Sequence, residues 1–256
     1  MIKCENLSAG YGGEKIIKDI SWEVAEGRLT AIVGPNGSGK STLLKSIIGQ
    51  TFVEGGGVYL EGKPLKQWKN KEMAKQIAYL PQSRNDANIS VFRMVLHGRF
   101  PYLAYPRHYT KKDEEMVIRE LKRMRISELQ EKLISELSGG EKQRAYLAMA
   151  LVQGAPILLL DEPTTYLDLS AQMELMEMLK QLVEEGKTVI VILHDLNHAL
   201  QYADEIVLME NGGLKQCGTS EEILKSGVLE DVFRVHIHIL QDKYGKEYYC
   251  FSLRNE

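Results

Sequence analysis

A short apolar run followed by a glycine-rich loop constrains this chain more than any other feature. Residues 29–33 read Leu-Thr-Ala-Ile-Val, and residues 34–42 read Gly-Pro-Asn-Gly-Ser-Gly-Lys-Ser-Thr. The loop has the spacing G-x-x-x-x-G-K-[ST], whose glycines let backbone N–H groups approach a phosphate without an intervening Cβ. Apolar residues at helical spacing follow in residues 43–48. A buried strand, a phosphate loop and a helix N-terminus are therefore predicted, and together they form an anion-binding site.

Side chains of the loop are predicted to hold a nucleotide and its metal. Lys40 supplies a point charge to the outer phosphates, and Ser41 offers its hydroxyl to a Mg²⁺ ion. A glycine-rich turn that matches by chance is the alternative, and it is disfavoured because strand and helix flank the motif as the chemistry requires. The residues expected to contact the nucleotide here are Gly34, Pro35, Asn36, Gly37, Ser38, Gly39, Lys40, Ser41 and Thr42.

Composition favours one α/β domain. The chain has 256 residues, a hydrophobic content of 44%, a net charge of -3 and no long basic run, so we expect ample core and no nucleic-acid partner. Its three cysteines are far apart and lack C-x-x-C spacing, so we expect reduced, half-buried thiols rather than disulfides or a metal site. No secretory segment and no membrane-spanning run is recognised, so a cytoplasmic location is expected.

The sequence pattern changes from strand-like to helical between residues 83 and 155. Strand signals vanish there, and charged residues alternate with apolar ones at helical spacing through residues 114–124, after a helix start at Thr110 and Asp113. Outside that region the pattern predicts an antiparallel pair at residues 2–7 and 16–24. It also predicts β segments at 58–60, 77–80, 157–160, 188–193, 206–209 and 214–217, and a hairpin within 235–253.

Three helices are predicted in the second half of the chain. Residues 170–185 are amphipathic, and residues 196–202 form a shorter helix. A capping box of Thr219 and Glu222 starts a third. The apolar side of the first of these is expected to contain Met173, Leu175, Met176, Leu179 and Leu182.

A second motif determines whether the chain only binds a nucleotide or also acts on it. The apolar residues 157–160 precede Asp161 and Glu162. A carboxylate at the end of a buried parallel strand projects into the crevice where ligands bind, so Asp161 is expected to hold the water shell of Mg²⁺. Glu162 is expected to point toward the γ-phosphate and to orient or deprotonate an attacking water. A solvated strand end is the weaker alternative, since four apolar residues come first.

Residues 137–144 read Leu-Ser-Gly-Gly-Glu-Lys-Gln-Arg. With the two motifs above, this run makes nearly the whole chain resemble the nucleotide-binding subunit of ATP-binding-cassette (ABC) transporters. The resemblance implies that Ser138, Gly139 and Gly140 of one copy contact a nucleotide on the phosphate loop of a second copy, in a head-to-tail dimer. The family usually has Gln where this chain has Glu141, a departure that bears on the fine geometry of the contact rather than on its role.

Four further positions match the family residue by residue. The resemblance implies that Tyr11 stacks on adenine, that Gln82 contacts Mg²⁺ or water and senses the membrane partner, and that His194 bonds a γ-phosphate oxygen. Asp168 belongs to the loop that crosses to the opposite subunit. A Tyr packed on the core and a merely structural His are the alternatives for Tyr11 and His194. The implied catalytic set is Glu162, His194 and Gln82, and the implied metal set is Ser41, Gln82 and Asp161.

The implied fold is the α/β fold of P-loop NTPases of the ABC ATPase type. It has a mixed β core, an antiparallel β subdomain and an inserted helical subdomain. Residues 1–256 would form one ABC ATPase domain. Within it, residues 1–82 and 156–256 would form the nucleotide-binding core with the antiparallel subdomain, and residues 83–155 the helical subdomain that carries the signature.

Three local spellings, at residues 97–102, at 161–168 and at 194–197 with 202–204, resemble importers of ferric siderophores, haem and cobalamin. They imply an ATP-hydrolysing subunit, peripheral on the inner face of the cell membrane, that drives uptake through a permease and is served indirectly by a substrate-binding protein. A permease helix would dock near Gln82 and residues 90–99. An ABC ATPase for another substrate class, and a soluble one acting in translation or DNA repair, remain alternatives. A module that binds ATP without turnover is disfavoured because Lys40, Asp161, Glu162 and His194 are all present.

Overall fold

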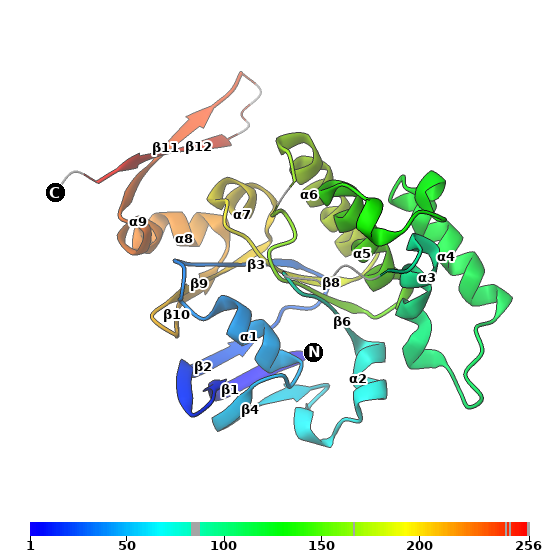
Figure 1. Ribbon diagram of the computed structural model, residues 1–256. Helices are drawn as coiled ribbons and strands as arrows, with labels where there is room; N and C mark the ends of the chain where they lie inside the picture. The colour runs from blue at the N-terminus through cyan, green and yellow to red at the C-terminus, as the bar shows by residue number, and fades with distance from the viewer. Residues whose placement is uncertain (83–87, 166, 244, 246, 255–256) are drawn as a thin grey trace. The chain divides into compact units, whose positions relative to one another are not determined.

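The computed structural model of the chain describes residues 1–82, 88–165, 167–243, 245 and 247–254 (Figure 1). The chain divides into two compact units, one formed by residues 1–67 and 179–256 and the other by residues 68–178. The boundaries expected for the helical subdomain, near residues 83 and 155, both lie inside the second unit, and that functional subdivision stays a prediction.

An antiparallel sheet forms one side of the first unit. Its strands are β1 (Ile2–Tyr11), β2 (Glu14–Glu23), β4 (Phe52–Leu60) and β5 (Lys63–Pro64), in the order β2-β1-β4-β5. Helix α1 (Lys40–Ile47) packs on this sheet with its buried residues Leu43, Leu44 and Ile47 (Figure 1). The predicted antiparallel pair is therefore confirmed, and both strands are longer than their apolar runs.

The first unit also contains a second, largely parallel set of strands, and the phosphate loop follows one of them. These are β3 (Leu29–Val33), β8 (Thr188–Ile192), β9 (Glu205–Glu210) and β10 (Gly213–Gly218), in the order β10-β9-β3-β8. Strand β3 runs parallel to both β8 and β9, and every residue of β3 and β8 is buried. Continuous burial explains why the two strands are apolar at every position except Thr30 and Thr188, rather than alternating between apolar and polar residues.

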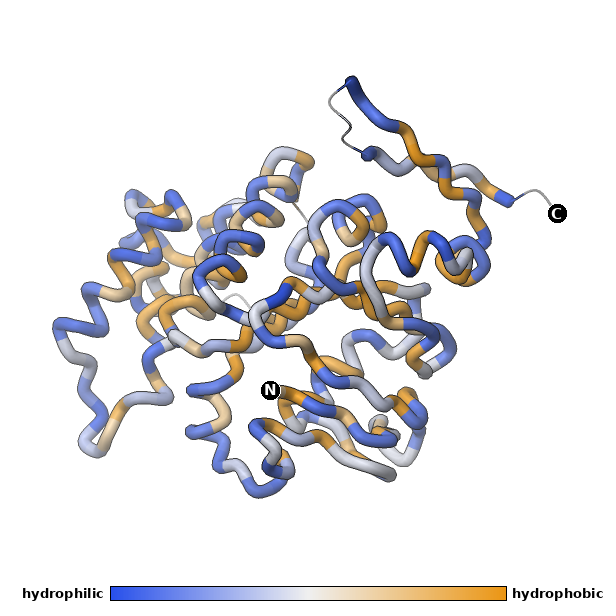
Figure 2. Tube along the Cα trace, turned by 180° about the vertical axis from the view of Figure 1, so that it is seen from behind, coloured by the Kyte–Doolittle hydropathy of each residue, from blue (hydrophilic) through white to orange (hydrophobic). Residues whose placement is uncertain are grey.

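Short helices and a hairpin complete the first unit. Helix α7 (Leu196–Tyr202) has the predicted bounds, α8 (Ser220–Ser226) begins at the predicted capping box, and α9 (Val228–Phe233) and the turn η1 (Leu65–Gln67) are additions. Strands β11 (Val235–Gln241) and β12 (Glu247–Leu253) form the predicted hairpin, and apolar segments run along both strands (Figure 2).

The second unit is mostly helical. Strands β6 (Ile77–Leu80) and β7 (Ile157–Leu160) pair in parallel, with the bounds predicted from their apolar runs. Helices and 3₁₀ turns occupy most of residues 91–152, as the sequence pattern predicts, and the unit has a further helix, α2, before β6. Its helices and 3₁₀ turns are α2 (Asn70–Gln76), α3 (Val91–Leu96), η2 (His97–Tyr102), α4 (Lys111–Arg123), η3 (Ser127–Leu129), η4 (Ile134–Glu136) and α5 (Gly139–Val152).

Two sequence expectations need correction. Met173 of α6 (Leu169–Glu184) is 47% exposed, because at 100° per residue it lies about 120° from the centre of the buried stripe formed by the other four residues. The cysteines are free as expected, yet none is half-buried: Cys4 is buried and Cys217 and Cys250 are exposed. Burial raises the pKa of the Cys4 thiol to about 12.

Candidate nucleotide-binding site

Two glycines give the loop after β3 its path. Gly34 has φ of 153° and Gly39 has φ of 96°. A Cβ on Gly34 would lie 2.2 Å from the carbonyl oxygen of Met209, and a Cβ on Gly39 would lie 2.7 Å from Cγ2 of Ile17. A larger residue at either position would therefore displace its neighbours. The loop runs close against β2 and β9 and delivers the chain into α1 at Lys40.

The Lys40 side chain folds back onto this loop. Its residue is only 6% exposed, and Nζ donates hydrogen bonds to the carbonyl oxygens of Gly34 at 2.8 Å and Pro35 at 2.9 Å. The ammonium group is thus held beside the loop backbone, where a phosphate oxygen would offer a stronger, charge-assisted acceptor. The predicted role of Lys40 stays a prediction, and this geometry suits it.

Ser38 carries a buried hydroxyl without a hydrogen-bond partner in the described chain. The residue is 3% exposed, and its backbone N–H donates to Pro35 O at 3.2 Å. A buried unsatisfied hydroxyl costs about 1–3 kcal/mol, so native proteins seldom keep one unless a ligand or water completes it. The loop therefore fits a phosphate group as the missing partner.

Asp204 anchors the strand that leads to the loop. Its Oδ2 accepts a hydrogen bond from Leu29 N at 2.8 Å, across 175 positions of sequence. Asp204 is the last residue of the third importer-like spelling, so this hydrogen bond gives that residue a structural role. At the end of β8, Leu193 N donates to Ile32 O at 3.2 Å, and His194 follows as an exposed residue. Tyr11, at the end of β1, is 39% exposed.

In the second unit the two adjacent carboxylates have different partners. Asp161 is 2% exposed, its N–H donates to Leu80 O at 2.9 Å, and Tyr79 donates its hydroxyl to Oδ2 at 3.2 Å. Glu162 has φ of 52°, a left-handed conformation that is uncommon for this residue type, and its Oε2 accepts a hydrogen bond from Gln82 Nε2. The backbone turn thus separates the two carboxylates, and Gln82 and Glu162 are brought together.

The remaining candidates of this unit lie at helix starts. Asp168 caps α6, because its Oδ1 accepts from Ala171 N at 2.8 Å. Ser138 is the N-cap of α5, whose first residues are Gly139 and Gly140, and a Cβ on Gly140 would meet only Cδ2 of Leu167 at 3.7 Å. The first N–H groups of a helix have no intrahelical acceptor, so the N–H groups of Gly139 and Gly140 at this end of α5 could donate to an anion.

The oxygen donors expected for Mg²⁺ fit that ion. Ser41, Gln82 and Asp161 offer a hydroxyl, an amide and a carboxylate, which are hard ligands of the kind Mg²⁺ prefers. Among the described residues no group of three His, Cys, Asp or Glu side chains could hold a metal by itself. Mg²⁺ usually keeps waters and phosphate oxygens in its shell, so a sparse protein donor set suits a metal that arrives with a nucleotide.

Comparison with known proteins decides the family. The family model described as ABC transporter matches residues 17–165, which include the phosphate loop, the Ser-Gly-Gly run and the acidic strand end. The chain belongs to the ABC transporter family. This result confirms the resemblance seen in the sequence, and the arrangement of strands and helices confirms the α/β ABC ATPase fold.

Individual relatives of this ABC ATPase cover almost its whole length. One, from Bacillus subtilis (strain 168), is described as the "Probable siderophore transport system ATP-binding protein YusV". It is 39% identical over 94% of this chain and 88% of its own. The "Iron(3+)-hydroxamate import ATP-binding protein FhuC" of the same organism is 35% identical over 100% of this chain and 97% of its own. A solved dimeric ATP-binding cassette in a post-hydrolysis state, bound to ADP and Pi, aligns with a TM-score of 0.76, 28% identity and coverage of 86% and 99%.

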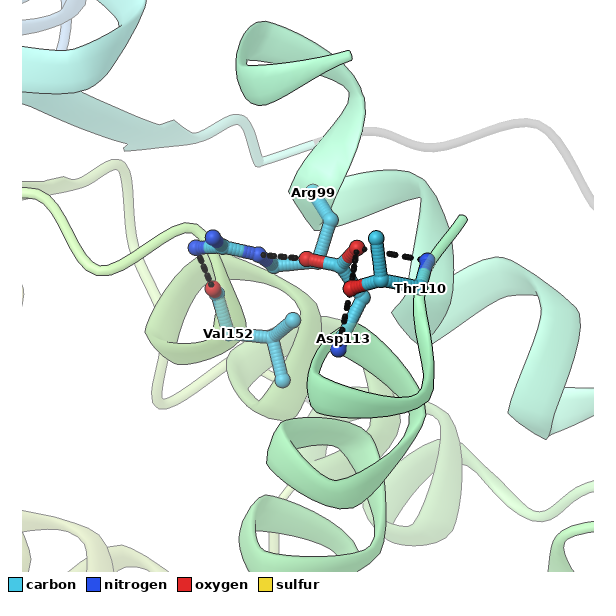
Figure 3. Close-up of polar contacts among 4 residues, drawn as sticks. All are labelled: Arg99, Thr110, Asp113 and Val152. Atoms are coloured by element: carbon cyan, nitrogen blue, oxygen red, sulfur yellow. Dashed lines mark hydrogen bonds and ion pairs between the residues drawn. The ribbon is translucent and has the colours of Figure 1, made fainter. Parts of the chain in front are cut away.

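Sequence reasoning missed one cluster of this ABC ATPase that lies behind its first importer-like spelling. Arg99 of η2 donates from Nε to Asp113 Oδ1 at 2.8 Å and from Nη1 to Val152 O at 3.1 Å, while Asp113 Oδ2 accepts from the N–H and hydroxyl of Thr110 (Figure 3). Burial alone would raise the pKa of Asp113, but Arg99 and Thr110 outweigh it and hold that pKa below its usual value. The spelling 97–102 therefore ties η2 to the start of α4 and the end of α5.

Tyr79 was also missed. It is the one polar-tipped side chain in the strand Ile77-Ala78-Tyr79-Leu80, which was the available signal. None of the helices in the described part of this ABC ATPase is both long and apolar enough to cross a bilayer.

Proposed function

We propose that this ABC ATPase binds Mg·ATP and hydrolyses it to ADP and phosphate as one half of a head-to-tail pair, and that the cycle drives import of an iron-siderophore type substrate through a membrane permease. The observation that carries the nucleotide site is the buried hydroxyl of Ser38, which has no hydrogen-bond partner among the described residues and lies in a loop that also holds the Lys40 ammonium group.

The described residues divide the chemistry between them. The N–H groups of residues 34–42 and Lys40 would neutralise the phosphates, and Tyr11 would stack on the adenine. Ser41, Gln82 and Asp161 would supply oxygen to Mg²⁺, which spreads the charge that develops on the transferred phosphoryl group. Glu162 would accept the proton of the attacking water, and His194 would bond a γ-phosphate oxygen.

Pairing completes the site because each copy carries two kinds of anion-binding end. The phosphate loop leads into α1, and the Ser138-Gly139-Gly140 run leads into α5. A triphosphate clasped between the loop of one copy and the α5 end of another would be neutralised from both sides, with Asp168 in the crossing loop. The dimeric state of the related cassette with ADP and Pi supports this proposal.

The substrate class rests on relatives and local spellings together. Both related ATP-binding proteins are named for siderophore or iron(3+)-hydroxamate transport, and they cover nearly the whole chain. The ligand itself would be handled by other polypeptides, a permease and a substrate-binding protein. The permease would contact the ATPase near Gln82 and residues 90–99. This contact would hold the ATPase peripherally on the cytoplasmic face of the cell membrane. Another transported class is the alternative if the permease partner proves selective for it.

Two variants test the nucleotide site. Lys40→Ala should weaken ATP binding itself, whereas Glu162→Gln should keep ATP binding but lose hydrolysis by a factor of about 10²–10⁴, since an amide cannot accept the proton. ATP affinity by equilibrium titration and turnover by phosphate release measure both effects. Normal ATP affinity in Lys40→Ala, or parent-like turnover in Glu162→Gln, would refute the assignment.

A third measurement tests import. The chain should co-purify from membranes with a multi-span permease, and reconstituted vesicles with that permease should accumulate a ferric siderophore only with ATP and the matching binding protein. Co-purification with ribosomes or DNA instead would favour the soluble alternative. Stimulation of turnover by a different substrate class would replace the siderophore assignment while leaving the ATPase intact.

A further inference from the structure

The hydroxyl of Ser138 is committed within its own chain. It donates a hydrogen bond to Glu141 Oε2 at 2.7 Å, and the same carboxylate oxygen accepts from Ser138 N at 2.8 Å. Glu141 N donates in return to Ser138 Oγ at 3.3 Å, so the two residues form a reciprocal capping box. A serine hydroxyl has one proton and cannot give it to Glu141 and to a phosphate oxygen at the same time.

Glu141 also brings negative charge to this helix end. The hydrogen bonds from the Ser138 hydroxyl and N–H hold the pKa of Glu141 below its usual value, with smaller contributions from Lys132 and Arg144, so the carboxylate is ionised at neutral pH. Arg144 also forms an ion pair with Glu174, whose Oε2 lies 3.2 Å from Arg144 Nη2. The carboxylate thus compensates the positive end of the α5 dipole that an incoming anion would use.

The Glu141 carboxylate would lie close to a phosphate bound at Ser138. Ser138 Oγ and Glu141 Oε2 are 2.7 Å apart, so a phosphate oxygen bonded to that hydroxyl would lie within about 5.5 Å of the carboxylate. At such a distance two negative charges repel appreciably unless water screens them fully. A neutral side chain of the same length at position 141 would remove the repulsion and keep an oxygen for the Ser138 N–H.

We infer that Glu141 holds the Ser138 hydroxyl in a self-capped state that opposes ATP-driven pairing of two copies. The inference rests on the proposed head-to-tail pair. Clasping a triphosphate then requires the hydroxyl to leave Glu141 and the carboxylate to move aside, and the return of that hydrogen bond favours separation. Glu141 acts through Ser138, so it is a positioning residue that weakens the closed pair.

The chain contains a matched control for this contact. At the start of α8, Thr219 N donates to Glu222 Oε2 at 2.8 Å, Thr219 Oγ1 donates to the same oxygen at 3.2 Å, and Glu222 N donates to Thr219 Oγ1 at 3.3 Å. The capping geometry is nearly that of Ser138 and Glu141, but no glycine pair follows Thr219. Glu222→Gln therefore reproduces the change in capping without touching the proposed nucleotide contact.

The test uses the full chain in the Glu162→Gln background, in which the ATP-bound pair is not lost through hydrolysis. Glu141→Gln should lower the ATP concentration for half-maximal pairing at least about fivefold, as expected for removing a unit charge near a phosphate at each of two sites. Sedimentation velocity measures the pairing. Glu222→Gln should leave it unchanged, and both variants should show a similar small change in melting temperature. Salt at about 0.5 M should reduce the effect of Glu141→Gln, because exposed charges are screened.

Each outcome is decisive. If the Glu162→Gln protein never pairs with ATP, the head-to-tail proposal fails and this inference fails with it. If it pairs, but Glu141→Gln pairs at the same or a higher ATP concentration, only the role of Glu141 is wrong. An equal shift in Glu222→Gln, or a shift insensitive to salt, would assign the effect to helix capping and would overturn the inference.

Discussion

The side-chain amide of Gln82 donates a hydrogen bond to the carboxylate of Glu162, across 80 positions of sequence. Glu162 holds a left-handed backbone conformation, with φ of 52°, two residues after a strand of four buried residues ends at Leu160. The Gln82 amide holds the Glu162 carboxylate through this hydrogen bond, and the Thr165 hydroxyl donates to the same oxygen at 3.5 Å. Gln82 therefore orients the proposed proton acceptor in addition to its expected contact with Mg²⁺.

This relationship predicts the effect of Gln82→Ala in the isolated chain. Loss of the orienting amide should lower kcat about tenfold, because a misplaced carboxylate meets the attacking water less often in productive geometry. The dissociation constant for ATP should change by no more than about twofold, since most of the proposed binding contacts come from the phosphate loop. Steady-state kinetics with an equilibrium ATP titration separates the two quantities.

The matched control for that variant is Gln153→Ala. Gln153 Nε2 donates to Ile77 O at 2.9 Å and has no place in the proposed chemistry. It should lower the melting temperature while kcat stays at the parent value. A weaker ATP affinity with an unchanged kcat in Gln82→Ala would contradict the orienting role.

Replacing Ser38 should change protein stability and ATP affinity in opposite directions. Ser38→Ala removes a buried hydroxyl that lacks a partner in the described chain, so the free protein should gain up to about 1 kcal/mol of unfolding free energy. ATP affinity should fall several-fold, because the phosphate loses the hydroxyl that fits it. Urea unfolding and an ATP titration on the same sample measure the two effects.

Ser46 provides the comparison, since its buried hydroxyl is bonded to Thr42 O at 2.7 Å. Ser46→Ala should cost about 1 kcal/mol of unfolding free energy and leave ATP affinity unchanged. If Ser38→Ala is destabilising and binds ATP normally, the hydroxyl has a structural partner and the fit argument is wrong.

The Arg99–Asp113 pair predicts a pH-dependent stability. The pKa of Asp113 is lowered in the folded chain, so the pair contributes stability above the unfolded pKa of about 3.9, and that contribution is lost as pH falls through the lower folded value. Arg99→Met leaves the nearly buried carboxylate without its countercharge and should cost about 3 kcal/mol at pH 7. The loss should shrink when urea unfolding is repeated below about pH 3.

An exposed pair serves as the control. Arg254 and Asp231 are 2.6 Å apart, with side chains 43% and 65% exposed, and such pairs contribute little. Asp231→Asn should change the unfolding free energy by less than about 1 kcal/mol at pH 7. An Arg99→Met protein as stable as the parent at pH 7 would contradict the role of the buried pair.

The features that the sequence predicts well are those fixed by nearby residues. The bounds of β6, β7 and α7 follow from local apolar runs, and the capping boxes at Thr110 and Thr219 are spelled within four residues. The box of Ser138 and Glu141 has the equivalent S-x-x-E pattern, so the sequence also contains the signal for this box.

Contacts between distant segments were not predictable in this way. Asp204 meets Leu29 across 175 positions, and Gln82 meets Glu162 across 80, because strand pairing and the packing of the core bring these segments together. Met173 fails for another reason: a helix that is apolar on several sides does not by itself show which side packs. The roles predicted for Gln82 and His194 come from the family resemblance, because no local sequence pattern indicates them.

Gly140 gives the sharpest separation of folding from function. A Cβ there would touch only Leu167 Cδ2, at 3.7 Å, an ordinary contact, and Gly140 lies within α5. Gly140→Ala should therefore stabilise the helix by up to about 1 kcal/mol. The added methyl group would occupy the space that a phosphate needs to reach the backbone N–H, so ATP-driven pairing in the Glu162→Gln background should be lost. Gly57→Ala, which also meets only ordinary contacts, nearest at 3.6 Å, should leave pairing unchanged. Unimpaired pairing of Gly140→Ala would place the triphosphate away from α5.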